Sequence, residues 1–97
     1  MPGSWSDVKQ ATPEIQKICD QIKADTEKAV GQTFSAFIAK RFAEQFASGK
    51  HYLIKVYVGD DEHIHLKVFQ CLPCDDGKME LSGFQYPKTN DDPLTPF

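Results

Sequence analysis

The sequence predicts an α+β fold in which one long helix packs across a curved antiparallel β-sheet of four to five strands. Two observations lead to this prediction. Apolar residues recur at intervals of three and four in a single stretch, between positions 12 and 31, and from Phe34 onward the pattern becomes typical of strands. A helix with one apolar stripe and an antiparallel sheet with one apolar face bury both surfaces when the helix lies across the sheet.

The helix is predicted to start at Thr12 and Pro13 and to reach about Val30. Thr can cap the exposed amide groups of the first turn, and Pro is tolerated at the first helical position because its missing N–H would be unpaired there anyway. Gly31 is the expected end of the helix. The stripe expected to face the sheet consists of Ile15, Ile18, Cys19, Ile22 and Thr26, and Ala29 would extend it.

Four strands are predicted after the helix. Residues 33–46 form a long candidate strand, whose length suggests a bend or a bulge. Residues 52–58 and 63–69 alternate between apolar and other side chains, with the turn sequence "GDDE" between them, and residues 79–86 form the last strand. Hairpin tips are expected at residues 47–51 and 72–78.

The length of 97 residues predicts a single domain over residues 1–97, able to bury roughly two-thirds of the surface of its unfolded chain. Residues 1–11 are small, polar and turn-forming with one Trp, which predicts a flexible N-terminal segment.

Composition argues against two classes of partner. Eleven Lys and Arg against fourteen Asp and Glu give a net charge of -3 without a basic stripe, so nucleic acid is not an expected ligand. The N-terminal sequence "MPGSWSDVKQ" has no basic stretch before an apolar run, and nowhere do about eighteen apolar residues stand together. A soluble cytoplasmic protein without a membrane partner is therefore expected.

Three cysteines, Cys19, Cys71 and Cys74, are an odd number, which favours reduced thiols over a disulfide framework. Cys71 and Cys74 form a C-x-x-C motif, but redox sites place this motif at the start of a helix in a βαβ unit. Here the motif follows a predicted strand and contains Pro73, so a redox role is not favoured.

His63, His65 and the two thiols of the C-x-x-C motif could in principle supply four zinc ligands. We favour the alternative that the histidines lie on a hydrated strand face, from which they would not converge easily with thiols in a loop. The acidic runs "GDDE", "PCDDGK" and "NDD" lack the ligand spacing of a calcium loop. No metal, no cofactor and no catalytic site are predicted, since the histidines have no Ser or Cys partner in a motif typical of hydrolases.

Three short segments occur in an order that is typical of one family. They are Gly3 near the N-terminus, Gln45-Phe46-Ala47-Ser48-Gly49 in the first hairpin, and Leu72-Pro73-Cys74 in the second hairpin. With the longer stretches "ATPEIQ", "YLIKVYVGDDEHIHLKVFQCLP" and "NDDPLTPF", the chain resembles the stefins over nearly its whole length. Stefins are cytosolic, disulfide-free cystatins. The first hairpin departs from their Gln-x-Val-x-Gly pattern, because Ala47 stands in place of Val and Phe46 is bulkier than the usual aliphatic residue.

The resemblance implies a cystatin-like fold and a reversible, tight-binding, non-covalent inhibitor of papain-like cysteine proteases of the cathepsin class. The N-terminal segment and two hairpin loops would block the active-site cleft, and the three segments just quoted would be the protease-binding residues. It also implies an active monomer and a domain-swapped homodimer as a second form. The alternative is a non-inhibitory scaffold or interaction protein with the cystatin fold, which the residues at positions 46 and 47 suggest.

Overall fold

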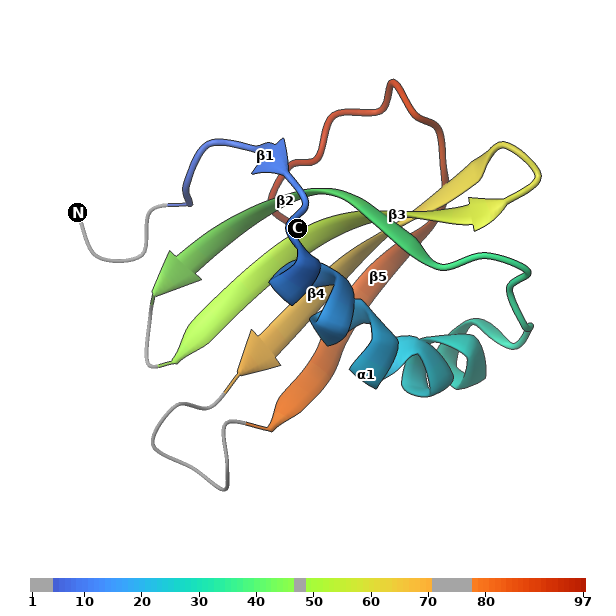
Figure 1. Ribbon diagram of the computed structural model, residues 1–97, viewed down its shortest axis with the longest axis horizontal. Coiled ribbons are helices and arrows are strands. Elements are labelled where there is room, and N and C mark those ends of the chain that lie inside the picture. The colour runs from blue at the N-terminus through green and yellow to red at the C-terminus, as the bar shows by residue number, and fades with distance from the viewer. Residues whose placement is uncertain (1–4, 47–48, 71–77) are drawn as a thin grey trace.

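The computed structural model describes residues 5–46, 49–70 and 78–97. Within these residues, one helix lies across one face of a five-stranded antiparallel sheet, as Figure 1 shows. The helix is α1 (Pro13–Val30), and the strands, in their order across the sheet, are β1 (Lys9–Gln10), β2 (Ile38–Phe46), β3 (Lys50–Gly59), β4 (Glu62–Gln70) and β5 (Met79–Lys88). The predicted α+β fold is confirmed.

The helix begins and ends at the predicted residues. The Thr12 hydroxyl accepts a hydrogen bond from the Ile15 amide at 3.3 Å, and Gly31 has the left-handed φ of 88° that favours glycine at a helix end. The predicted stripe from Ile15 to Thr26 is buried, but Ala29 is exposed, so the extension of the stripe to Ala29 is wrong. Thr26 tolerates burial because its hydroxyl donates to the Ile22 carbonyl at 2.9 Å.

The core lies between α1 and the sheet. The side chains predicted to share one face of β3 and β4 all contribute to it, together with the helix stripe and three phenylalanines: Ile15, Ile18, Cys19, Ile22, Phe34, Phe37, Phe42, Tyr52, Ile54, Val56, Val58, Ile64, Leu66 and Val68.

The long strand predicted over residues 33–46 is shorter in the structure. Phe34 and Phe37 precede β2. Their rings stack in the core with centroids 6.0 Å apart, and the Phe34 amide donates to the Glu27 carboxylate at 2.8 Å. These contacts replace strand pairing because the chain must first cross from the helix to the sheet. The predicted irregularity is confirmed, since the pairing of β2 with β3 shifts register between Ala39 and Arg41.

The prediction that residues 1–11 form a flexible segment is wrong for residues 9–11, which pair with β2. Lys9 and Gln10 form β1, which pairs with Phe42 and Arg41 of β2, and the Ala11 amide donates to the Lys40 carbonyl at 3.0 Å. The reason is that β2 would otherwise be an edge strand with unpaired backbone groups, which a neighbouring extended segment can satisfy. A composition rich in small and polar residues does not reveal this pairing.

The prediction that His63 and His65 lie on a hydrated strand face is wrong. The sheet face opposite the helix is covered. His63 is 5% exposed and His65 is fully buried. The chain after β5 covers this face: Leu94 packs with Ala43 and Leu53, and Trp5 packs against the same cluster. The C-terminal segment runs over the back of the sheet in Figure 1.

Lys55 lies on the same covered face and is 2% exposed. Its ammonium group donates to three backbone carbonyls of the C-terminal segment, those of Thr89, Asn90 and Asp92, at 2.8, 2.9 and 2.5 Å. A buried charge with full hydrogen bonding is tolerated, whereas an unpaired one would be costly. Lys55 therefore fastens the C-terminal segment to the sheet.

Candidate functional site

The two hairpin connections of the sheet leave it from the same end. The cross-strand register places four residues in one row, in which Phe46 pairs with Lys50, Lys50 with Gln70, and Gln70 with Met79. We call this row the hairpin end. In Figure 1 it is the end where β2 and β4 finish and where β3 and β5 begin. Both predicted inhibitory hairpins must therefore connect their strands at the hairpin end.

The structure places three of the predicted site residues here. Gln45 and Phe46 are the last two residues of β2, and Gly49 directly precedes β3. The remaining predicted residues lie outside the described part of the chain: Gly3, Ala47, Ser48, Leu72, Pro73 and Cys74.

Phe46 is the most exposed of the large apolar residues in the described part of the chain, with 61% of its surface accessible. Alternation along β2 puts Phe42, Glu44 and Phe46 on the helix side of the sheet. Phe42 is buried in the core, so the exposure of Phe46 shows that α1 does not cover the hairpin end. The ring is available for contact with another molecule.

Gly49 has two reasons to be glycine. Its φ is 129°, and a Cβ atom there would lie 2.8 Å from the Gln70 carbonyl oxygen and 2.7 Å from the Phe69 ring. The first hairpin can therefore lie this close to β4 only without a side chain at position 49. This supports a structural role for Gly49, whatever else the residue contacts.

The N-terminal segment approaches the hairpin end along β2. Lys9 pairs with Phe42, and further back along the chain the Ser6 amide donates to the Glu44 carbonyl at 2.9 Å. The segment thus runs antiparallel to β2, and from Lys9 back to Ser6 it moves toward Phe46. The described part of the N-terminal segment and the strand that leads into the first hairpin therefore lie side by side.

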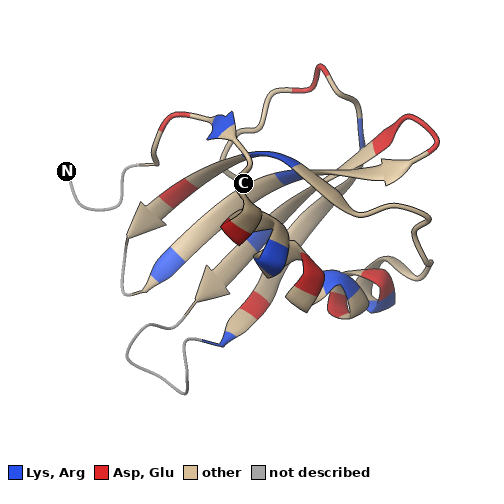
Figure 2. Cartoon of the chain, viewed as in Figure 1, with Lys and Arg blue, Asp and Glu red and all other residues tan. Residues whose placement is uncertain are grey.

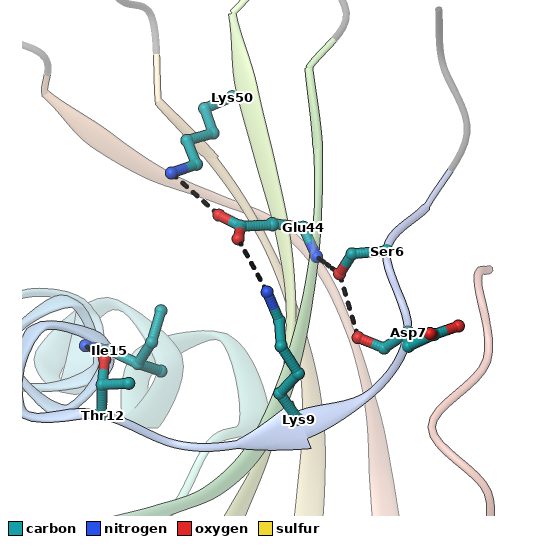
Figure 3. Close-up of polar contacts among 7 residues, drawn as sticks. All are labelled: Ser6, Asp7, Lys9, Thr12, Ile15, Glu44 and Lys50. Carbon is teal, nitrogen blue, oxygen red and sulfur yellow. Dashed lines mark hydrogen bonds and ion pairs between the residues drawn. The ribbon is translucent and has the colours of Figure 1, made fainter. Parts of the chain in front are cut away.

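Glu44 is the charged centre of this region. Its two carboxylate oxygens accept from different lysines, Oε1 from Lys50 at 2.8 Å and Oε2 from Lys9 at 3.2 Å, as Figure 3 shows. The hydrogen bond from Lys50 is the main reason that the pKa of Glu44 lies below its ordinary value, and the bond from Lys9 acts in the same direction. In turn, the hydrogen bond to Glu44 is the main reason that the pKa of Lys50 is raised.

Acidic and basic residues are interspersed over much of the described part of the chain. In Figure 2 acidic and basic positions are interspersed along α1, and an acidic cluster marks the turn between β3 and β4. No group of three or more His, Cys, Asp or Glu residues that could hold a metal ion occurs within residues 5–46, 49–70 and 78–97. In that same part of the chain, no helix is both long enough and apolar enough to cross a membrane.

Comparison with known proteins decides the family. A model of the cystatin domain matches residues 3–91. The chain belongs to the cystatin family. Together with the individual relatives below, this match confirms the resemblance to stefins that the sequence motifs carry.

Individual relatives match this cystatin over its whole length. It is 42% identical to cystatin-B of Oplegnathus fasciatus over 97 residues, which cover 100% of this chain and 97% of the relative. It is 41% identical to human cystatin-A over 97 residues, with 100% and 99% covered. The leukocyte cysteine proteinase inhibitor 1 of Sus scrofa is 38% identical over 97 residues, with 100% and 94% covered.

Sequence reasoning missed the residues that hold the hairpin end together, namely Ser6, Lys9, Glu44 and Lys50. A signal existed for two of them. Glu44 and Phe46 are two residues apart in a predicted strand, hence on one face, and a Lys follows the turn residue Gly49. Only the cross-strand register shows that this Lys lies opposite Phe46.

Proposed function

We propose that this cystatin is a reversible, tight-binding, non-covalent inhibitor of papain-like cysteine proteases of the cathepsin class. The N-terminal segment and the two hairpin loops would enter the active-site cleft together and block it. The observation that carries the proposal is the exposed ring of Phe46 at the hairpin end, where both hairpin connections leave the sheet. The printed name of the pig relative, a cysteine proteinase inhibitor, supports the same function.

Preorganisation is the physical basis of the proposed affinity. Phe46 and Gly49 belong to a hairpin whose strands are paired along their length. Little backbone freedom is therefore lost when these residues bind a protease. An apolar ring gains free energy when it leaves water for a protein cleft. An interface of standard size, about 800 Å² per partner, then suffices for nanomolar affinity.

The proposed contact residues are Gly3, Gln45, Phe46, Ala47, Ser48, Gly49, Leu72, Pro73 and Cys74. No residue of the inhibitor is catalytic in this proposal, and no covalent bond to the protease thiol forms. Inhibition is steric and therefore reversible by dilution. The monomer is the proposed active form, and the cytoplasm, where stefins act, is the proposed location.

Titration of papain with the protein, using a fluorogenic peptide substrate, tests the proposal. Inhibition should be complete, with a constant in the nanomolar range or below. Phe46→Ser should raise the inhibition constant by about tenfold or more, since it removes most of the apolar contact of one large side chain. Ile38→Ser is the matched control, because Ile38 is also an exposed apolar residue of β2, 47% accessible, but lies at the opposite end of the strand.

Ile38→Ser should inhibit as the wild type does. Equal constants for the wild type and Phe46→Ser would show that the hairpin end is not the inhibitory surface. An unchanged rate of papain with the wild-type protein would favour the alternative, a non-inhibitory scaffold with the cystatin fold.

A further inference from the structure

We propose that Glu44 is a positioning residue that locks the N-terminal segment to the first hairpin, so that both enter the protease in a fixed mutual arrangement. The proposal rests on the proposed function and adds a residue outside the contact segments. Glu44 lies two positions before Phe46, and its contacts reach both elements.

Three contacts tie Glu44 to the N-terminal segment. The Ser6 amide donates to the Glu44 carbonyl at 2.9 Å, and the Glu44 amide donates to the Ser6 hydroxyl at 3.0 Å. The Lys9 ammonium lies 3.2 Å from Glu44 Oε2 and 5.1 Å from the centroid of the Phe42 ring. Figure 3 shows Ser6 beside the Glu44 backbone and the Lys9 ammonium group beside the Glu44 carboxylate. Both the backbone and the side chain of one residue thus hold the segment.

The other carboxylate oxygen reaches the first hairpin. Glu44 Oε1 lies 2.8 Å from the Lys50 ammonium, which also lies over two rings, 5.0 Å from the Phe46 centroid and 5.1 Å from the Tyr52 centroid. Lys50 is thereby held between a carboxylate and two aromatic faces. A single carboxylate connects the N-terminal segment, through Lys50, to the exposed ring of Phe46.

These ion pairs contribute little to the folding free energy. The side chains of Glu44, Lys50 and Lys9 are 24%, 23% and 50% exposed, and such pairs near the surface are typically weak. Their effect should appear in binding instead, because an inhibitor whose contact elements are already arranged loses less conformational freedom in the complex. Loss of the carboxylate should therefore weaken inhibition by a few-fold while leaving the fold intact.

A double-mutant cycle on the full chain tests the role. The four proteins are the wild type, Glu44→Gln, Gly3→Arg and the double variant, each titrated against papain. Glu44→Gln should raise the inhibition constant about threefold in the wild-type background, because ordering by ion pairs near the surface cannot contribute more to binding than the pairs contribute in the free inhibitor. In the Gly3→Arg background, where the N-terminal segment should no longer fit the cleft, the same change should raise the inhibition constant by less than about 1.5-fold. Equal costs in both backgrounds, or no cost in either, would overturn the proposal.

A readout without protease separates this inference from the proposed function. Trp5, the one Trp of the chain, precedes Ser6 and packs against the cluster of Ala43, Leu53 and Leu94. If the Glu44 carboxylate helps to hold the segment, Glu44→Gln, which keeps the two hydrogen bonds between the Glu44 backbone and Ser6, should raise the acrylamide quenching constant of Trp5 by about 1.5-fold or more. Asp25→Asn, on the exposed side of α1, removes the same charge and should leave both quenching and inhibition unchanged.

The outcomes are distinguishable. If the wild type fails to inhibit papain but Glu44→Gln still releases Trp5, the proposed function is wrong and the locking role of Glu44 stands. If the wild type inhibits and Trp5 quenching is the same in Glu44→Gln, the locking role is wrong. A melting temperature within a few degrees of the wild-type value shows that Glu44→Gln is folded, and a variant that unfolds as a whole would contradict the argument that these ion pairs contribute little to stability.

Discussion

The ammonium group of Lys50 lies 5.0 Å from the centroid of the Phe46 ring, across the stem of the first hairpin. The pair explains how a large apolar ring can stand at the end of a strand without a place in the core. The ring has an intramolecular neighbour on one side, and most of its surface remains accessible to a partner. Four predictions follow from this relationship and from the other contacts of the fold.

Lys50→Met should weaken papain inhibition by about threefold to tenfold, because it removes the cation beside Phe46 and one partner of Glu44 while keeping an unbranched side chain. Lys17→Met, on the exposed side of α1, is the matched control and should have no effect. The measurement is the inhibition constant at moderate ionic strength. An unchanged constant in Lys50→Met would mean that Lys50 does not orient the ring in the free inhibitor.

Acid should destabilise the protein through the histidines beneath the C-terminal segment. Burial is the main reason that the pKa of His65 falls from an ordinary 6.5 to about 4, with Lys55 and Lys88 acting in the same direction and Asp92 opposing. Between these two pH values the imidazole of His65 binds a proton in the unfolded chain but not in the folded chain. The stability that neutral His65 contributes is therefore fully present above pH 6.5 and is lost as the pH falls toward 4. The pKa of His63 is lowered too, mainly by burial.

For His65 alone, the free energy of unfolding should fall by on the order of 3 kcal/mol between pH 7 and pH 4. Urea unfolding at pH 7, 5.5 and 4 measures it. His65→Leu should reduce the change of the unfolding free energy with pH in this range. Parallel pH profiles for the wild type and His65→Leu would show that His65 is not the group responsible.

Reductant should leave the fold unchanged. Burial is the main reason that the pKa of the Cys19 thiol is raised to about 12, with the neighbouring charge of Asp20 adding to it, so the thiol stays neutral in the core. In the native protein at pH 8, iodoacetamide should leave Cys19 unmodified, and in urea it should react. Peptide mass spectrometry gives the answer, with melting curves in the presence and absence of dithiothreitol alongside. Rapid labelling of Cys19 in the native protein, or a melting temperature that depends on the reductant, would contradict the interpretation of Cys19 as a buried free thiol.

A domain-swapped dimer should be inactive as an inhibitor. If the connection between Phe46 and Lys50 straightens, β2 and β3 become one strand, and α1 with β2 can pack into a second molecule. Nearly all native contacts are then remade between chains, but they must first be broken. The exchange is therefore slow without partial unfolding. Brief heating in reductant, size-exclusion chromatography and papain titration of both fractions test this. A dimer that inhibits as well as the monomer, per chain, would place the hinge elsewhere.

Local chemistry in the sequence was enough to predict the helix and most of the strands. Thr12, Pro13 and Gly31 act on the backbone groups nearest to them, so the ends of α1 follow from residues that are neighbours in sequence. Alternation in β3 and β4 likewise predicts which side chains share a face. For the candidate site, the exposed Phe46 and the turn at Gly49 were accessible to the same reasoning, and the family motif identified both.

The tertiary structure alone decided what covers each face and which side chains meet across strands. Alternation indicates that His63 and His65 share a face, but only the assembled fold shows that this face is buried. On that face Leu94 packs against Leu53, and Lys55 donates hydrogen bonds to the C-terminal segment. The pairing of Lys9 with Phe42 depends in the same way on the free edge of β2. Glu44 and Lys50 meet because the hairpin sets the register of its strands. These contacts join residues far apart along the chain, or on facing strands, and their free energy depends on the assembled fold rather than on local propensity.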